Sequence, residues 1–155
     1  MKNYFLSLTI LVTSSAVFAT DATLDLKVFA QQYFQAMVAT QAPDATKQDI
    51  ENYLALLTDD VGHSHLPYVT DDSRQPGGKE AMRKGMAFYL AAHTEHKAEL
   101  LDVFTFNNSA VAIRYSNSAK GAHPQNNQAI SYAQTMMEVL EMENGKVAVI
   151  RKYHQ

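Results

Sequence analysis

Apolar residues recur every three or four positions in the first half of the chain, and this spacing predicts amphipathic helices. Three helices are expected, over residues 24–40, 47–57 and 79–93. The residues that share one face of the first and third helices are Leu26, Phe29, Tyr33 and Met37, then Met82, Met86, Tyr89 and His93. Pro43 separates the first two helices, because proline is not tolerated inside a helix.

The pattern changes to a period of two after residue 96, and this predicts β-strands. Strands are expected over residues 97–106, 110–118, 129–143 and 146–154, with a short extended piece over 61–69. Asn144-Gly145 is a strong signal for a hairpin turn between the last two strands. Helices followed by a run of antiparallel strands form an α+β layout, in which the sheet buries one face against the three N-terminal helices.

The first 19 residues have the features of an export signal. Lys2 is a positive start, residues 4–12 are mainly apolar, and the sequence at residues 17–19 fits a cleavage site. This apolar run is too short to cross a bilayer, which takes about 20 residues. We therefore expect a signal peptide over residues 1–19 and one domain over residues 20–155; a buried N-terminal helix is the alternative.

Composition and charge narrow the range of partners and compartments. The chain has 13 Lys and Arg against 16 Asp and Glu, and loss of Lys2 with the signal leaves a net charge of 12 − 16 = −4. An acidic chain without a basic cluster is a poor nucleic-acid binder. The absence of cysteine excludes disulfides, thiol nucleophiles and cysteine-ligated zinc. We expect a periplasmic or secreted protein that binds no nucleic acid and has no membrane segment after cleavage.

Four motifs follow one another in the order YFQAMVA, YLALLTDDV, GGKEAMRKGM and MEVLEMENGKVAVIRKY. With these motifs, residues 24–154 resemble the NTF2-like superfamily, and its SnoaL-like branch is the most similar. The resemblance implies a cone, in which a curved antiparallel sheet wraps around three helices and opens at one end into an apolar pocket. It also implies a homodimer packed through the sheet. It implies no single activity, because one fold hosts many functions. We expect a small apolar ligand and no cofactor.

Within that resemblance, the ketosteroid-isomerase pattern places three polar groups around the pocket. Tyr33 matches the tyrosine on the first helix, His65 falls on the position of the general base, and Glu138 matches the second acid. The chain departs from the pattern at the base. Histidine replaces aspartate there, and the spacing to the following proline is one residue longer, so that Ser64 or Leu66 could occupy the position instead. The resemblance therefore implies a similar layout of polar groups rather than steroid isomerisation.

His63 and His65 stand two residues apart on the short extended piece, so their side chains face the same side. Three roles are open to them: binding a metal, transferring a proton, or lining the pocket as hydrogen-bonded wall residues. A catalytic zinc needs a third protein ligand, which the spacing does not select, and no metal site is expected. Proton transfer suits the pair better, because histidine titrates near neutral pH.

Tyr33 and Glu138 are the other candidate catalytic residues. The Tyr33 hydroxyl either donates a hydrogen bond to a developing oxyanion or belongs to a core tyrosine with a buried partner. Glu138 lies between apolar neighbours and points inward if Leu140 does. An inward carboxylate needs a partner such as His, Tyr or Arg, because an unpaired buried charge is costly. The alternative is a register in which Glu138 faces solvent.

The predicted function combines these residues in one pocket. Beyond the three candidate catalytic residues, those expected to contact the ligand are His63, Tyr53, Met86 and His93. For His93, a structural role at the end of the third helix is the alternative. An enzyme of this kind would be a cofactor-free isomerase, cyclase or dehydratase, with His65 as base and with Tyr33 and Glu138 polarising the substrate oxygen. The rival interpretation is a ligand-binding or dimeric interaction module without catalysis.

Overall fold

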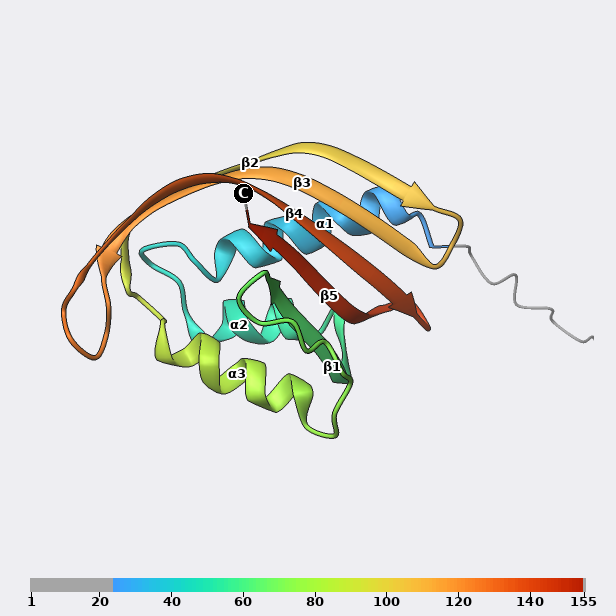
Figure 1. Ribbon diagram of the computed structural model, residues 1–155, viewed down its shortest axis with the longest axis horizontal. Coiled ribbons are helices and arrows are strands. Elements are labelled where there is room, and N and C mark those ends of the chain that lie inside the picture. The colour runs from blue at the N-terminus through green and yellow to red at the C-terminus, as the bar shows by residue number, and fades with distance from the viewer. Residues whose placement is uncertain (1–23, 155) are drawn as a thin grey trace, which may run out of the picture.

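A computed structural model describes residues 24–154 of the protein. It contains three helices and five strands: α1 (Leu26–Ala39), α2 (Lys47–Leu54), β1 (Leu57–Leu66), α3 (Gly78–Phe88), β2 (His93–Phe106), β3 (Ala110–Ala122), β4 (Ala129–Glu143) and β5 (Lys146–His154). The predicted α+β class and the three helices packed on a curved sheet are confirmed (Figure 1). The predicted signal peptide lies outside the described residues.

The strands form one sheet with the spatial order β1-β5-β4-β3-β2. Strands β2 to β5 are a run of antiparallel neighbours, as their sequence predicts. Strand β1 lies at the edge beside β5 and runs parallel to it, which the period-two pattern could not indicate. The long strands arch over α1, while α2 and α3 lie beneath it beside β1 (Figure 1). This arrangement places the helices against the concave face of the sheet (Figure 1), and side chains from both layers form the core.

The first two helices begin at well-formed caps. The Asp25 side chain accepts hydrogen bonds from the backbone N–H groups of Lys27 and Val28 at 2.9 and 3.2 Å. Thr46 and Asp49 form a reciprocal capping box at the start of α2. Such caps satisfy backbone donors that have no partner inside the helix. They therefore help to fix the positions from which Tyr33 and Tyr53 project into the interior.

Two predicted helices end earlier than expected. Helix α2 stops at Leu54 rather than at residue 57, because Leu57 already belongs to β1. Helix α3 stops at Phe88 rather than at residue 93. Ala91 takes a left-handed backbone conformation with φ of 61°, which ends the helical path. His93 consequently begins strand β2, and the alternative role at the end of the third helix is wrong.

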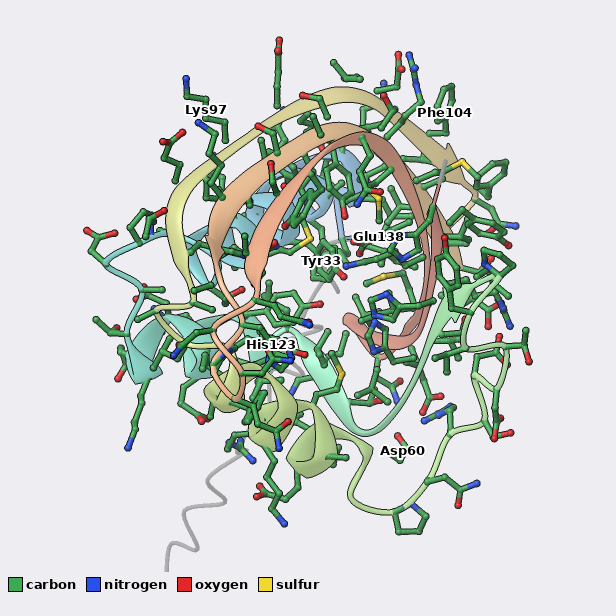
Figure 2. The ribbon with its side chains drawn as sticks, turned by 60° about the vertical axis from the view of Figure 1, so that its left-hand side comes forward. Tyr33, Asp60, Lys97, Phe104, His123 and Glu138 are labelled. Carbon is green, nitrogen blue, oxygen red and sulfur yellow. The ribbon has the colours of Figure 1, made fainter. Side chains whose placement is uncertain are left out.

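The two faces of the sheet differ in what covers them. On the concave face, Ile113, Glu138 and Lys152 are paired in register across β3, β4 and β5, and the first two are fully buried. On the convex face, Phe104 and Met137 are exposed. Figure 2 shows Phe104 outside the arch and Glu138 beside Tyr33 inside it. The predicted inward register of Glu138 is therefore the one observed.

The segment after β1 folds back and covers the outer side of that strand. His65 and Val69 exchange two backbone hydrogen bonds, of 2.9 and 2.7 Å. Further along, Asp72 pairs with Arg151 of β5 at 2.5 Å. Gly62 permits this close packing, since a Cβ atom there would lie 2.0 Å from the backbone oxygen of Asp72. The covering segment thus holds the strand that carries His63 and His65 in place.

Candidate functional site

A cavity of about 370 Å³ opens between the concave face of the sheet, α1, β1 and α3. Its wall is formed by Met37, Thr40, Gln41, Ala42, Tyr53, His63, His65, Met82, Gly85, Met86, Tyr89, Ala91, His93 and Lys152. The apolar part of this wall includes methionines and aromatic rings, and methionine adapts well to irregular ligand shapes. Histidines and one lysine supply the polar groups. A mostly apolar cavity with a few convergent polar groups is typical of small-molecule sites.

A buried polar cluster lies directly behind this wall. Its centre is the Glu138 carboxylate, which has no exposed surface. Oε1 of Glu138 accepts hydrogen bonds from the Tyr115 hydroxyl at 2.6 Å and from Lys152 Nζ at 2.8 Å. Oε2 accepts one from the Tyr33 hydroxyl at 2.7 Å. Three donors therefore converge on one carboxylate, which is how a buried negative charge is made tolerable.

The hydroxyls of Tyr33 and Tyr53 form the next link, at 2.9 Å. Tyr33 has one hydroxyl proton, and it is donated to Glu138 because a carboxylate only accepts. The bond between the two tyrosines must then run from the Tyr53 hydroxyl to the Tyr33 oxygen. The chain of donors thus starts at Tyr53, whose ring faces the cavity, and ends on the buried carboxylate.

The cluster controls the charge of its members. Burial alone would raise the pKa of Glu138, but the positive charge of Lys152 and the hydrogen bonds from Lys152, Tyr115 and Tyr33 outweigh it and leave the pKa below its ordinary value. Burial and the charge of Glu138 raise the pKa of all three tyrosines. At neutral pH the cluster is therefore one carboxylate, one ammonium and three neutral phenols.

Histidines form the adjacent part of the wall. The rings of His63 and His65 meet edge to face with centroids 4.4 Å apart. His65 Nδ1 lies 3.1 Å from Nε2 of His154 at the end of β5, within hydrogen-bond distance. For the other ring nitrogen of His65, Nε2, no hydrogen-bond partner is found within residues 24–154. That nitrogen remains available to a molecule in the cavity.

His63 and His65 are both neutral at physiological pH. Burial, followed by the charge of Lys152, lowers the pKa of His63 to about 4. The same two causes, with smaller contributions from His63 and His154, lower the pKa of His65 to about 3. A neutral imidazole offers one N–H donor and one acceptor nitrogen. The pair is therefore suited to hydrogen bonding, and its two members are weak bases.

The structure brings the seven predicted site residues into one region, in two layers. The residues that line the cavity are His65, His63, Tyr53, Met86 and His93. Tyr33 and Glu138 have no exposed surface and stand behind the wall. They reach the cavity through Tyr53 and Lys152, with which they share hydrogen bonds. Figure 2 shows the two buried residues side by side inside the arch.

Three members of the site were not predicted from the sequence: Lys152, Tyr115 and His154. Lys152 and Glu138 are directly paired across β5 and β4, but a register shift between Glu141 and Met142 lies between this pair and the Asn144-Gly145 turn. Counting back from the turn without that shift would pair Glu138 with Arg151, so the hairpin signal alone did not identify Lys152 as the partner of an inward Glu138. Tyr115 could have been found from the sequence, because it shares strand parity with the inward Ile113.

A second pair of histidines lies at another part of the rim. His93 Nδ1 is 3.0 Å from the backbone oxygen of Gln41. His96 stacks on His93 with ring centroids 5.7 Å apart, and its Nε2 is 2.9 Å from Oδ1 of Asn117. Within residues 24–154, no three histidine or carboxylate side chains are grouped closely enough to hold a metal ion.

Known proteins with a similar sequence or structure identify the family to which this architecture belongs. The model of the SnoaL-like domain family matches residues 30–150, which is most of the chain. The chain belongs to the SnoaL-like domain family. No curated protein matches the sequence of this SnoaL-like chain.

Solved structures similar to this SnoaL-like domain share its fold at low identity. One is a candidate polyketide cyclase from Xanthomonas campestris pv. campestris, with 16% identity, 83% of this chain and 89% of that chain covered, and a TM-score of 0.59. Another is a ketosteroid isomerase-like protein from Erwinia carotovora atroseptica, with 13% identity, coverage of 88% and 98%, and a TM-score of 0.56. A third is the epoxide hydrolase/cyclase-like enzyme SalBIII, with 11% identity, coverage of 84% and 93%, and a TM-score of 0.58. These likenesses establish the NTF2-like fold.

Proposed function

We propose that this SnoaL-like domain binds a small, largely apolar molecule in the cavity between its sheet and helices. The observation that carries the proposal is the cavity itself, with its apolar wall of Met37, Met82 and Met86 and the uncharged pair His63 and His65. An apolar ligand gains about 25 cal/mol for each Å² of apolar surface that it removes from water. The histidines then orient the ligand by hydrogen bonds.

Gly85 provides a way to test this proposal without damaging the core. It lies on α3 among the cavity residues, and a Cβ atom added there meets nothing within 4 Å. In Gly85→Leu a branched side chain occupies space beside Met82 and Met86, while the helix gains a residue of higher helix propensity. The variant should fold at least as well as the parent chain and should bind ligand less tightly.

The experiment uses native mass spectrometry of the purified chain together with displacement of an apolar fluorescent dye. We expect a retained or displaceable molecule in the parent chain and a loss of dye binding of about tenfold in Gly85→Leu. Ala87→Leu is the matched control, because residue 87 is exposed on the same helix and does not line the cavity. Equal dye binding by the parent chain and Gly85→Leu would show that the cavity is not the binding site.

A second candidate function is proton transfer by His65, and the His65–His154 contact favours it. The hydrogen bond between their rings fixes one nitrogen of His65 and leaves the other for the ligand. The same bond connects the cavity wall to His154, which is partly exposed. A substrate oxygen would accept hydrogen bonds from Lys152 while His65 transfers a proton of the substrate. Glu138 and Tyr33 would position Lys152 and Tyr53 from behind the cavity wall.

The relatives indicate which reactions to try first. The similar structures include a candidate polyketide cyclase and an epoxide hydrolase/cyclase-like enzyme, so ring closures and isomerisations of small carbonyl compounds form the first panel. His65→Ala should abolish turnover while dye binding changes by less than about tenfold. His123→Ala serves as the control, since His123 does not line the cavity. If no compound in the panel is turned over by the parent chain, the ligand-binding function stands alone.

Assembly and location complete the proposal. We propose a homodimer formed through the convex face of the sheet, where Phe104, Met137 and Tyr153 are exposed in a patch that also carries the Arg114–Asp102 ion pair. Phe104→Lys should convert the dimer to a monomer in light scattering without loss of helicity.

We also propose export to the periplasm or beyond, which N-terminal sequencing of the protein recovered from each cell fraction tests. No helix within residues 24–154 is long and apolar enough to cross a membrane.

A further inference from the structure

We propose that the ligand of this cavity is an organic carboxylate, with its apolar body against the methionines and its carboxylate against Lys152. This inference rests on the proposed ligand-binding function and names the class of molecule bound there. It depends on the position of one charged side chain relative to the cavity.

The cavity wall carries formal charge of one sign only, and that sign is positive. Lys152 is the single lysine or arginine among the lining residues in the described part of the chain, and no aspartate or glutamate lines the wall. The nearest carboxylate, Glu138, has no exposed surface, whereas the Lys152 side chain is 16% exposed. The pair thus presents its positive end to the cavity and keeps its negative end in the core. An anion in the cavity meets attraction from Lys152 before it meets repulsion from Glu138.

Lys152 also has unused hydrogen-bonding capacity. An ammonium group carries three donors, and one of them is directed to Oε1 of Glu138. Ligand oxygen atoms can accept the others. A wholly apolar ligand would remove these donors from water without replacing the lost hydrogen bonds, which is costly for a charged group. A carboxylate compensates this loss better than an amide or an alcohol, because charge-assisted hydrogen bonds are the stronger ones.

The histidines next to Lys152 do not oppose an anion. His63 and His65 line the same cavity as Lys152, and each can turn an N–H toward a second ligand oxygen. The hydroxyl of Tyr53 is committed to Tyr33, so the tyrosine contributes its ring rather than a polar group. The resulting site has a cationic end at Lys152 and an apolar end at Met82 and Met86 of α3. This polarity matches a molecule with one ionised end and an apolar body.

Matched ligand pairs separate this inference from the broader proposal. Isothermal titration calorimetry at pH 7.5 would compare octanoate with octanamide, and cinnamate with cinnamamide. Each pair has nearly the same shape and differs in charge. We expect each carboxylate to bind at least about tenfold more tightly than its amide, which corresponds to about 1.4 kcal/mol.

Two variants test the assignment to Lys152. Lys152→Met with Glu138→Gln removes both charges together, so that no unpaired charge is left in the core, and the preference for carboxylate over amide should fall to about one. Lys152→Arg retains the cation and should keep a preference of several fold. Because each value is a ratio measured within one variant, a general change in cavity shape cancels.

The outcomes are distinct. A preference that is lost in the double variant and kept in Lys152→Arg supports the inference. Equal binding of carboxylates and amides to the parent chain overturns it, while the ligand-binding function remains. An unchanged preference in the double variant also overturns it, because another group then recognises the anion. No binding of any of the four probes to the parent chain counts against both proposals.

Discussion

Lys152 Nζ lies 2.8 Å from Oε1 of Glu138, and the two residues are directly paired across strands β5 and β4. The pair is asymmetric, since one member touches the cavity and the other is sealed from it. Tyr33 and Tyr115 hold the sealed member by its two oxygens. The buried Glu138 carboxylate therefore holds the Lys152 ammonium group in a fixed position at the cavity wall.

Removal of one member of this pair should cost more than removal of both. Lys152→Met leaves a buried carboxylate without its cation, and breaking such a pair typically costs about 3–5 kcal/mol. In the double variant with Glu138→Gln, no charge remains. Tyr33 and Tyr115 approach different carboxylate oxygens, so one of them can still donate to the amide oxygen and the other can accept from the amide N–H. We expect the double variant to recover most of the loss in urea unfolding.

Lys120→Met is the control for this experiment. Lys120 pairs with Glu95 on the surface, where the two side chains are 63% and 60% exposed. Exposed ion pairs contribute little to stability, so the free energy of unfolding should change by less than about 1 kcal/mol. A double variant as unstable as Lys152→Met would show that the charge pair is not what stabilises this part of the core.

The order of the tyrosine hydrogen bonds predicts unequal effects of deleting each hydroxyl. Tyr33→Phe removes a donor from the Glu138 carboxylate and the acceptor of Tyr53, so two buried groups lose partners, at a cost of about 2–4 kcal/mol. Tyr53→Phe removes one donor from a hydroxyl oxygen and should cost about 1 kcal/mol. Thermal unfolding of both variants measures the difference. Equal losses would contradict the direction inferred for the bond between them.

Stability should fall on mild acidification because of His63 and His65. Their pKa values are about 4 and about 3 in the folded protein, against an ordinary value of 6.5 for histidine. Between pH 6.5 and about 4, His63 and His65 bind protons in the unfolded chain but not in the folded protein. The free energy of unfolding therefore decreases as the pH falls from about 6.5 toward 4. Glu138, with its lowered pKa, adds a further loss below about 4.5.

Replacement of both His63 and His65 by Gln should flatten this pH profile between 6.5 and 4.5. Some slope remains, because the pKa values of His96 and His154 are also lowered by burial. Melting temperatures across this range provide the measurement, with His123→Gln as a comparison outside the cavity. A profile as steep in the double variant as in the parent chain would assign the acid sensitivity to other groups.

Gly62 and Gly85 should respond in opposite ways to alanine. At Gly62 the new methyl group would lie 2.0 Å from the backbone oxygen of Asp72, so the covering segment must move, and we expect a loss of at least about 2 kcal/mol. At Gly85 it meets open space in the middle of α3, and replacing a helical glycine should stabilise by about 1 kcal/mol. Urea unfolding distinguishes the two. Stabilisation by Gly62→Ala would place the covering segment elsewhere.

The sequence predicts the order of the elements well, because helical and strand periodicities reflect local burial. Glu138 is the best example: its strand parity with Leu140 indicates an inward side chain, and both residues are fully buried. The helix ends are less well predicted. The apolar stripe continues to His93 although the helix stops at Phe88, since the strand that follows lines the same cavity.

Lys152 shows why the site was only partly predictable. Residues 147–150 of β5 are all buried, because neighbouring elements cover both faces of that strand, and the alternation that would assign Lys152 to the inner face is lost. A lysine near the chain terminus therefore reads as a surface residue. The parallel pairing of β1 with β5, which brings His63 and His65 toward Lys152, is a long-range contact without a local signal.

That parallel pairing also bears on how the protein reaches its native state. Strands β2 to β5 can pair in sequence through short connections, whereas β1 meets β5 only after closure of a chain segment that includes α3 and three other strands. Loop-closure entropy makes such a distant contact slow to form. The two strands carry His65 and Lys152, so we expect the cavity to be assembled late in folding, after the antiparallel meander is in place.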